Sequence, residues 1–191
     1  MATGALRAPL KDRGDDCYET PREATLTLMK CEQIPRRIWE PACGPGAIVS
    51  VLRGSGRQVV ATDLVDYGCE DSDSGVDFLM ETRAPTGVSC IVTNPPYKLA
   101  DQFVRHGLWL VPRVIMLLRL AYLEGANRSD IIDHHTARVH LGRERLPMMH
   151  RHGWEGSKLG SAAMPFAWFV FTQEPTFGVI EVRRMSWRDG Q

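Results

Sequence analysis

The chain has 191 residues, no net charge at neutral pH and a hydrophobic content of 43%, which is enough for one domain with a full core. Its longest apolar run is far shorter than the roughly 20 residues that cross a bilayer, and residues 1–13 lack the apolar core of a signal peptide. The five cysteines show no C-x-x-C spacing, which favours reduced thiols over disulfides or a metal site. We therefore expect a cytoplasmic protein with no membrane partner and no bound metal.

The polar residues 1–16 are expected to form a flexible N-terminus before a domain that spans residues 17–191. In that domain, apolar periodicity and flanking turn residues predict helices that alternate with strands. The helices are expected at residues 21–31, 47–53, 99–110 and 125–137. The strands are expected at residues 37–40, 58–63, 76–79, 88–93, 114–120, 166–172 and 177–184.

This alternation predicts an α/β fold with one doubly wound, mostly parallel sheet of seven strands. The last two predicted strands flank a turn-like segment at residues 173–176, so we expect them to pair as an antiparallel hairpin at or near an edge. Residues 138–160 show no clean period and are rich in Arg, His, Met and Gly. A long connection of this kind inside a compact domain is usually functional or disordered.

A predicted strand, a glycine turn and a predicted helix follow one another near the start of the domain. Gly44 and Gly46 let the backbone approach a ligand closely, and the helix start offers free N–H groups. Asp63 lies 19 residues after Gly44, at the end of the next strand, where a carboxylate suits ribose hydroxyls. Val49 occupies the third glycine position of the dinucleotide fingerprint, and Pro45 removes an N–H from the turn. The pattern therefore favours an adenosine-containing cofactor without phosphates.

Asn94, Pro95, Pro96 and Tyr97 directly follow the apolar strand that is predicted at residues 88–93. In open α/β sheets, ligands bind at this carboxyl end of the strands. The tip offers hydrogen-bond acceptors for a planar amino group and an aromatic face on which it can stack. This chemistry is typical of methyl transfer to an exocyclic or amide nitrogen.

Five segments carry a resemblance to a known family. In chain order they are Tyr18-Glu19-Thr20-Pro21, Glu40-Pro41-Ala42-Cys43-Gly44-Pro45-Gly46, Asp63, Asp77-Phe78-Leu79 and Asn94-Pro95-Pro96-Tyr97. Together they resemble class I S-adenosylmethionine-dependent methyltransferases, specifically the amino-methyltransferases that make N6-methyladenine in DNA. The order of the segments is similar to the γ arrangement of restriction–modification enzymes. The rest of the chain resembles small phage or prophage enzymes of this type.

The resemblance implies a Rossmann-like fold, S-adenosylmethionine as the cofactor and DNA as the partner. It implies a catalytic role for Asn94, Pro95, Pro96 and Tyr97. The cofactor-binding residues that it implies are Tyr18, Thr20 and Pro21 along the methionine part, Glu40, Ala42, Cys43, Gly44 and Gly46 around it, Asp63 and Leu64 at the ribose, Asp77 and Phe78 at the adenine ring, and Asn94.

The chain departs from the family pattern at two places. Ala42 replaces the first glycine of the common Gly-x-Gly-x-Gly loop, and the short acidic segment after Asp63 leaves room for one helix fewer. Cys43 is interpreted as a small wall residue rather than a nucleophile. C5-cytosine methylation needs an attacking cysteine, and no Pro-Cys dipeptide occurs in the sequence.

Positive charge gathers in residues 98–160, which hold 10 Lys and Arg against 6 Asp and Glu, as well as all six histidines. This segment is either a phosphate-facing surface or a solvated one, and residues 123–160 are the candidate target-recognition insertion. The candidate phosphate contacts are Lys98, Arg119, Arg128, Arg138, Arg143, Arg145, Arg151 and Lys158. Tyr122 either stacks on the far face of a base or packs in the core.

The mechanism that fits these residues places two acceptors on the adenine N6 hydrogens, namely the Asn94 side-chain oxygen and the Pro95 carbonyl. The base is then flipped out of the duplex or taken from a single strand. Three alternatives stay open: an RNA N-methyltransferase, a protein glutamine N5-methyltransferase, and a non-catalytic module that binds the cofactor.

Overall fold

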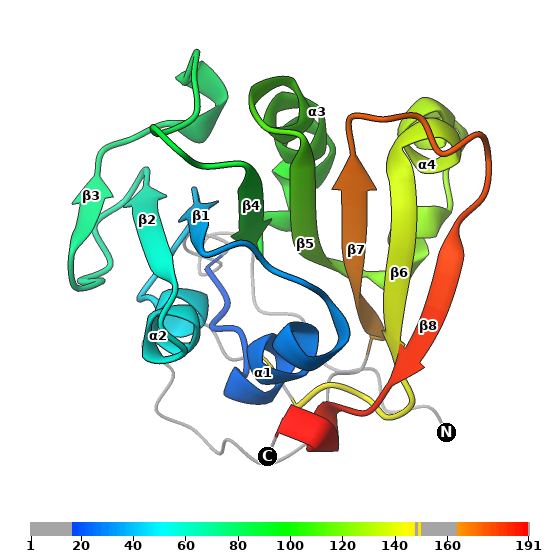
Figure 1. Cartoon of the computed structure of the whole chain (residues 1–191), viewed down its shortest axis with the longest axis horizontal. Coiled ribbons are helices and arrows are strands. Elements are labelled where there is room, and N and C mark those ends of the chain that lie inside the picture. The colour runs from blue at the N-terminus through cyan, green and yellow to red at the C-terminus, as the bar shows by residue number, and fades with distance from the viewer. Residues whose placement is uncertain (1–16, 148, 150–163, 191) are drawn as a thin grey trace, which may run out of the picture.

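The computed structural model describes residues 17–147, 149 and 164–190. Within these residues the chain forms one sheet flanked by helices on both faces (Figure 1). The strands are β1 Arg37–Glu40, β2 Gln58–Asp63, β3 Ser72–Ser74, β4 Cys90–Thr93, β5 Arg113–Arg119, β6 Thr136–Gly142, β7 Phe166–Thr172 and β8 Glu181–Met185. The α-helices are α1 Arg22–Cys31, α2 Ala47–Gly54, α3 Ala100–Leu110 and α4 Ser129–His135.

The sheet has eight strands in the order β3-β2-β1-β4-β5-β7-β6-β8. Strands β1 to β5 are parallel, β7 runs antiparallel between β5 and β6, and β8 pairs parallel with β6. The predicted doubly wound, mostly parallel α/β sheet is thus confirmed. Because β1 to β5 are parallel, their carboxyl ends meet along one edge of the sheet and their amino ends along the opposite edge.

The sheet separates two hydrophobic cores because side chains alternate between its faces along each strand. In β5, Ile115 and Leu117 pack with α1 and α2, whereas Val114, Met116 and Leu118 pack with α3 and α4. These five side chains are at most 1% exposed. A continuous apolar run is the signature of a strand covered on both faces, and it correctly predicted this central strand.

The third strand is not the predicted one. Residues 76–79 were expected to form it, but Phe78 belongs to a 3-10 turn, Phe78–Met80, where the Asp77 side chain accepts a hydrogen bond from Leu79 N. The strand is β3, Ser72–Ser74, which pairs with the end of β2. It lies at a sheet edge and is polar and mostly exposed, so it has no apolar pattern that could reveal it.

The expected C-terminal hairpin is also wrong, and the number of strands rises from seven to eight. β6 lies between β7 and β8, so these two strands are not paired with each other. The sequence pattern missed β6 because it carries Arg138 and His140 on a buried strand, and this polar content looked like a loop. The predicted helix at residues 125–137 is shorter, since α4 begins at Ser129 after a 3-10 turn, Ala126–Arg128.

Three further 3-10 turns complete the described chain: Tyr97–Leu99, Leu120–Leu123 and Trp187–Gly190. The first of these follows β4 directly and leads into α3, so it holds Tyr97 close to the end of the strand. Among the helices of the described residues, none combines the length and the apolar character of a membrane span.

Candidate cofactor and catalytic site

A pocket of about 230 Å³ lies at the carboxyl ends of β1, β2 and β4. Nine of the predicted cofactor-binding residues line it, together with Pro96 of the predicted catalytic segment. These nine are Tyr18, Thr20, Glu40, Ala42, Cys43, Gly44, Asp63, Leu64 and Asn94. The fold therefore brings together segments that are up to 76 residues apart in the sequence. Their role in binding a cofactor stays a prediction.

The glycine turn after β1 is shaped by two residues with positive φ. Gly44 has φ +52° and Gly46 has φ +88°, a region that strongly favours glycine. A Cβ atom on Gly44 would lie 3.1 Å from Cys17 Sγ, and one on Gly46 would lie 2.8 Å from Cys69 Sγ. The turn therefore needs glycine at both positions, for its backbone conformation and for the close approach of neighbouring side chains.

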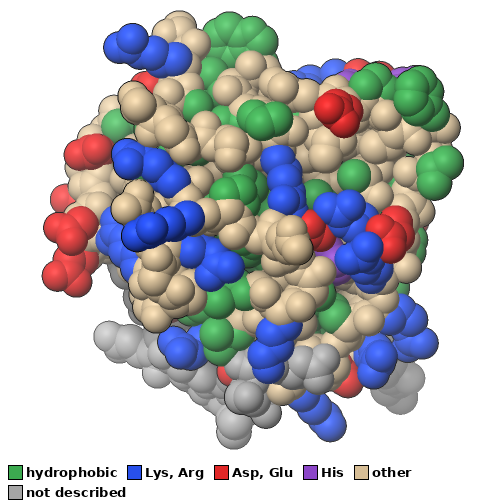
Figure 2. All heavy atoms as spheres, in the orientation of Figure 1, with side chains coloured by type: hydrophobic (Ala, Val, Ile, Leu, Met, Phe, Trp, Pro, Cys, Tyr) green, Lys and Arg blue, Asp and Glu red, His purple; other side chains and the backbone are tan. Residues whose placement is uncertain are grey.

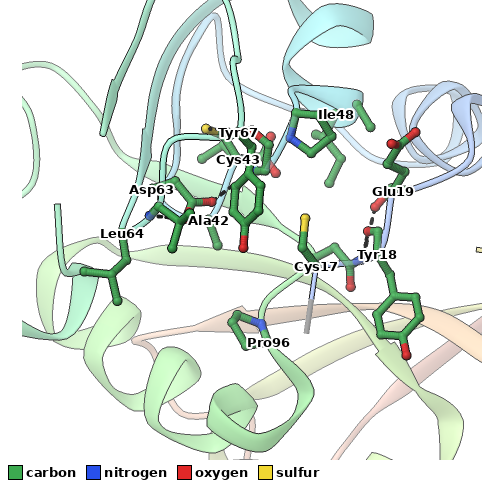
Figure 3. Close-up of a pocket in the computed structure, with 17 residues that line it drawn as sticks. Cys17, Tyr18, Glu19, Ala42, Cys43, Ile48, Asp63, Leu64, Tyr67 and Pro96 are labelled. Carbon is green, nitrogen blue, oxygen red and sulfur yellow. Dashed lines mark hydrogen bonds between the residues drawn. The ribbon is translucent and has the colours of Figure 1, made fainter. Parts of the chain in front are cut away.

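Asp63 fixes this turn from the end of β2. Its Oδ2 accepts a hydrogen bond from Gly44 N at 2.8 Å, and its Oδ1 accepts one from Val65 N at 3.0 Å. A carboxylate has about four acceptor sites, so each oxygen keeps a lone pair for a further donor. Asp63 lines the pocket, which makes a pair of ribose hydroxyls a chemically suitable ligand (Figure 3).

Glu40 lies at the end of β1 and is 2% exposed. Burial raises the pKa of its carboxyl well above the usual value, and the nearby Cys69 and Asp63 raise it further. Its Oε2 is buried without a hydrogen-bond partner among the described residues. A buried acid of this kind binds a cationic or hydrogen-donating ligand favourably, because such a ligand relieves the cost of its desolvation.

Asn94 stands at the tip of β4 with its amide group held in one orientation. Its Nδ2 donates to the Tyr18 carbonyl at 3.2 Å and to Thr20 Oγ1 at 3.1 Å. A carbonyl can only accept, so the nitrogen must face Tyr18 and the oxygen must face away from it. Asn94 Oδ1 is buried with no donor among the described residues. Within the described structure, the Asn94 oxygen is thus an oriented acceptor that no donor reaches.

Tyr97 lies beside this acceptor in an aromatic cluster. Its ring stacks on Tyr18 at 5.8 Å between centroids and lies 5.9 Å from Phe166. The Arg119 guanidinium sits 4.7 Å from the centre of the same ring. The Sδ atom of Met149 lies 3.9 Å from the Tyr97 hydroxyl and 3.8 Å from Asn94 Nδ2. Flat and polarisable groups therefore surround the Tyr97 ring.

Several predicted residues lie outside the pocket lining. Gly46 shapes the turn without lining the pocket, and Pro21 immediately precedes α1. The Asp77 side chain accepts from Leu79 N, and Phe78 is 2% exposed, with its ring packed on Trp39 and Phe103. The Phe78 side chain is thus part of the hydrophobic core.

Tyr122 also occupies a core position, one of the two interpretations that its sequence allows. Its ring packs edge-on against Phe169 and Phe171, and its hydroxyl donates to Asp101 Oδ1 at 3.1 Å. The Arg128 guanidinium covers the ring at 4.5 Å from its centre. A ring packed in this way offers a nucleic-acid base no open face.

Among the predicted phosphate contacts, Lys98, Arg119, Arg143 and Arg145 are exposed. Arg119 and Lys98 belong to segments that adjoin the Asn94 tip, whereas Arg138 is engaged with Glu32 at 2.7–2.8 Å. Arg151 and Lys158 lie outside the described residues, as do residues 148 and 150–160 of the candidate recognition insertion. In its described part, residues 123–160 include α4 and β6.

Sequence reasoning assigned no individual role to seven residues that line the pocket, although two of them, Glu19 and Pro45, belong to the segments that carry the resemblance. The seven are Cys17, Glu19, Pro45, Ala47, Ile48, Val65 and Tyr67. Figure 3 shows the Tyr67 ring reaching across the pocket between Asp63 and Cys17. Pro45, Ala47 and Ile48 adjoin the glycine turn, so its neighbourhood was a usable signal. Tyr67 comes from a loop without periodicity, and its sequence context gave no such signal.

No protein-family model matches the sequence, and the comparison with curated proteins also gives no match. Solved structures do share the fold. One, described as a modification subunit of a type I restriction enzyme from Vibrio vulnificus YJ016, has 12% identity and a TM-score of 0.53, over 90% of this chain and 48% of that one. This chain therefore spans about half the length of that subunit.

Two further structures cover most of both chains. A protein from Pyrococcus horikoshii, described as an RNA methyltransferase, has 11% identity and a TM-score of 0.54, over 81% of this chain and 85% of that one. The 23S rRNA methyltransferase ErmE has 13% identity and a TM-score of 0.53, over 83% and 71%. The chain is thus structurally similar to class I S-adenosylmethionine-dependent methyltransferases, and identities this low show the fold alone.

Proposed function

We propose that this protein is an S-adenosylmethionine-dependent methyltransferase that methylates the exocyclic N6 amine of adenine in DNA. The observation that carries the proposal is Asn94, whose amide nitrogen is held by Tyr18 and Thr20 while its oxygen is buried with no donor among the described residues. Asn94 lies at the carboxyl end of β4 and lines the pocket beside the glycine turn.

The pocket suits a cofactor that carries positive charge and hydroxyl groups. Glu19, Glu40 and Asp63 line it, and none of the described lining residues is Lys, Arg or His. When bound, S-adenosylmethionine supplies an electrophilic methyl group on its sulfonium. Asp63 would hold the ribose hydroxyls, and the buried Glu40 would face a donor of the methionine part. The positive φ of Gly44 lets the backbone of the glycine turn approach the cofactor closely.

The amine is activated by localising its lone pair, which is otherwise delocalised into the adenine ring. Asn94 Oδ1 and the Pro95 carbonyl would each accept a hydrogen bond from one N6 hydrogen, and the two bonds would draw the nitrogen toward tetrahedral geometry. The rigid Pro95 and Pro96 fix these acceptors, so they need no reorganisation during the reaction. An amide cannot take up a proton at neutral pH, so the proton leaves after methyl transfer.

Tyr97 supplies the surface on which the base would stack. A flat guanidinium, that of Arg119, already lies 4.7 Å from the centre of its ring. A planar base stacked on an aromatic side chain gains about 1–3 kcal/mol, and the base must leave the duplex to reach it. Arg119 would then be free to contact a phosphate, as the exposed Lys98 also could.

DNA is favoured as the substrate by the order of the segments, in which the glycine turn and Asp63 precede Asn94 to Tyr97, as in γ-type DNA amino-methyltransferases. Two of the structures with the same fold are described as RNA methyltransferases. RNA is therefore the outcome against which the proposal must be tested, together with protein glutamine.

The test offers labelled S-adenosylmethionine together with unmethylated duplex DNA, single-stranded DNA, RNA or protein, followed by mass spectrometry of the digested products. We expect N6-methyladenine from DNA with the wild type and with Gln58→Ala, an exposed amide at the amino end of β2. Asn94→Ala should give at least 100-fold less product. Label in RNA or protein alone, or equal activity of the two variants, would overturn the proposal.

A further inference from the structure

A second pocket, of about 830 Å³, lies at the opposite edge of the sheet from the proposed cofactor site. Its cationic residues come from the amino ends of the strands: Arg57 precedes β2, Arg113 begins β5, and Arg138 lies near the start of β6. Lys30 near the end of α1 and Arg183 of β8 complete the set. The volume falls within the range of about 300–1,000 Å³ that is typical of small-molecule sites.

Glu32, which follows α1 directly, organises the guanidinium groups of this pocket. Its carboxylate accepts hydrogen bonds from Arg138 Nε at 2.8 Å, from Arg138 Nη2 at 2.7 Å and from Arg113 Nη2. His140 Nε2 lies 2.8 Å from its second oxygen. Burial alone would raise the pKa of Glu32, but the contacts of His140, Arg138 and Arg113 outweigh burial and lower the pKa to about 2. The carboxylate is therefore charged at neutral pH and holds both arginines in place.

This single carboxylate does not neutralise the pocket. Four arginines line it against Glu32, and an excess of two positive charges remains among these residues when Glu181, the partner of Arg183, is counted as well. Figure 2 shows one face of the molecule, where Lys and Arg side chains outnumber acidic ones around the centre. A concentration of like charge in a concave site raises the local potential for an oppositely charged ligand.

Two of the guanidinium groups also have unused donors. The Nε atoms of Arg57 and Arg113 are buried and have no acceptor among the described residues. Arg57 donates through Nη1 to Ser55 Oγ at 2.7 Å, so its side chain is held beside the pocket. Buried donors without acceptors cost folding free energy, and a ligand rich in acceptor oxygens could satisfy them after a small side-chain movement.

We propose that this pocket binds a phosphate-bearing ligand through the guanidinium groups of Arg57, Arg113, Arg138 and Arg183. Guanidinium forks match the geometry of phosphate oxygens and bind them through paired hydrogen bonds. A phosphate carries more charge and more acceptors than a carboxylate, so it answers both the charge excess and the unused donors. The site is separate from the proposed methyl-transfer site and does not depend on that function.

The same phosphate chemistry has two sources, a free nucleotide or polyphosphate and the backbone of a nucleic acid. Inorganic pyrophosphate is the simplest probe because it has no base that could enter the other pocket. Isothermal titration calorimetry of the full chain with pyrophosphate, at constant ionic strength, measures its affinity. Competition by adenosine triphosphate or by a duplex oligonucleotide then identifies the source.

The test variant is Arg57→Gln/Arg183→Gln, which removes two cations whose side chains are partly exposed. The control is Arg22→Gln/Arg83→Gln, which removes the same charge from exposed positions that line neither pocket. Thermal unfolding checks that both variants are folded. We expect pyrophosphate to bind the wild type at one site. Its affinity should be at least tenfold lower for the test variant and within twofold of the wild-type affinity for the control. No saturable binding, or equal weakening in both variants, would overturn the proposal.

Discussion

The two edges of the sheet carry opposite electrostatic character, although strand β2 adjoins the pockets at both. At the carboxyl edge, the pocket is lined by Glu19, Glu40 and Asp63 and has no Lys, Arg or His among its described lining residues. At the amino edge, five Lys and Arg side chains surround Glu32. The first edge would repel a phosphate and accept a cationic cofactor, whereas the second would do the reverse. The two ends of one short strand, β2, thus adjoin two pockets that suit ligands of opposite charge.

The buried acids of the two edges also differ in what stabilises them. Glu40 has an oxygen without a hydrogen-bond partner in the described part of the chain, and burial raises its pKa well above the usual value. Glu32 is surrounded by donors, and its pKa falls to about 2. Burial acts on both carboxyls in the same direction, so the partners decide the outcome. We therefore expect a bound ligand to stabilise Glu40, whereas Glu32 is already stabilised by the side chains around it.

The largest expected effect is a loss of cofactor affinity when the carboxyl edge is altered at Asp63. Asp63→Ala removes the carboxylate that holds Gly44 N and would hold the ribose. We expect the Kd for S-adenosylmethionine to rise by roughly 100-fold, because charge-assisted hydrogen bonds are lost. Calorimetry measures the Kd, and Asp73→Ala, an exposed position in β3, serves as the matched control. Equal affinities of the two variants would mean that the cofactor does not bind at this edge.

A second substitution removes the ion pairs at the amino edge and leaves the carboxyl edge unchanged. Glu32→Gln should lower the free energy of unfolding by about 2–3 kcal/mol, because the Arg113 and Arg138 guanidinium groups lose their counter-charge. Urea unfolding measures the loss, with Glu174→Gln on the exposed β7–β8 connection as the control. The Kd for S-adenosylmethionine should stay within twofold of the wild type. A parallel loss of cofactor binding would show that the edges are coupled.

The Glu32→Gln variant should also differ from the wild type in how its stability changes at acidic pH. The pKa of Glu32 is lowered from about 4.5 to about 2 by folding, so its carboxylate stabilises the native state above pH 4.5, and this contribution is lost as the pH falls toward 2. In urea titrations across this window, the wild type and Glu174→Gln should lose more stability than Glu32→Gln does. Curves that run parallel for all three proteins would refute the assigned role of Glu32.

The smallest expected effect concerns Glu40. Its pKa is raised by folding, so the native state loses stability as the pH rises above the ordinary carboxyl value. Glu40→Gln removes this titration and should make the apoprotein more stable than the wild type at pH 8, with little difference at pH 4. Binding of S-adenosylmethionine should weaken by a few fold at pH 8. Urea unfolding at both pH values and calorimetry check these results, and a variant less stable than the wild type at pH 8 would contradict them.

Much of the carboxyl edge could be predicted from sequence because its residues follow strands with clear patterns. Asp63 ends β2, Asn94 directly follows β4, and Gly44 lies in the turn that follows β1, so each is close to the end of a strand that the sequence predicted. Tyr67 and Cys17 could not be placed, since they come from segments without a period. Position along a recognisable strand therefore decided what could be predicted at this edge.

The amino edge could not be predicted in the same way. Arg138 and His140 lie on β6, where a polar pattern hid the strand, and Glu32 pairs with both the half-buried Arg138 and the buried His140. That pairing joins residues more than 100 positions apart. Local patterns record hydrophobic burial, whereas this burial depends on a partner that only the fold supplies. For the same reason the expected hairpin was wrong, since β6 lies between β7 and β8.

The most direct test of the proposed chemistry separates cofactor binding from methyl transfer at Asn94. Single-turnover methylation of DNA, at saturating S-adenosylmethionine, should be at least 100-fold slower in Asn94→Ala, while the Kd of the cofactor changes by no more than about threefold. That result would place the Asn94 oxygen on the reacting amine. An unchanged rate, or a loss of rate that follows entirely from weaker cofactor binding, would contradict this role.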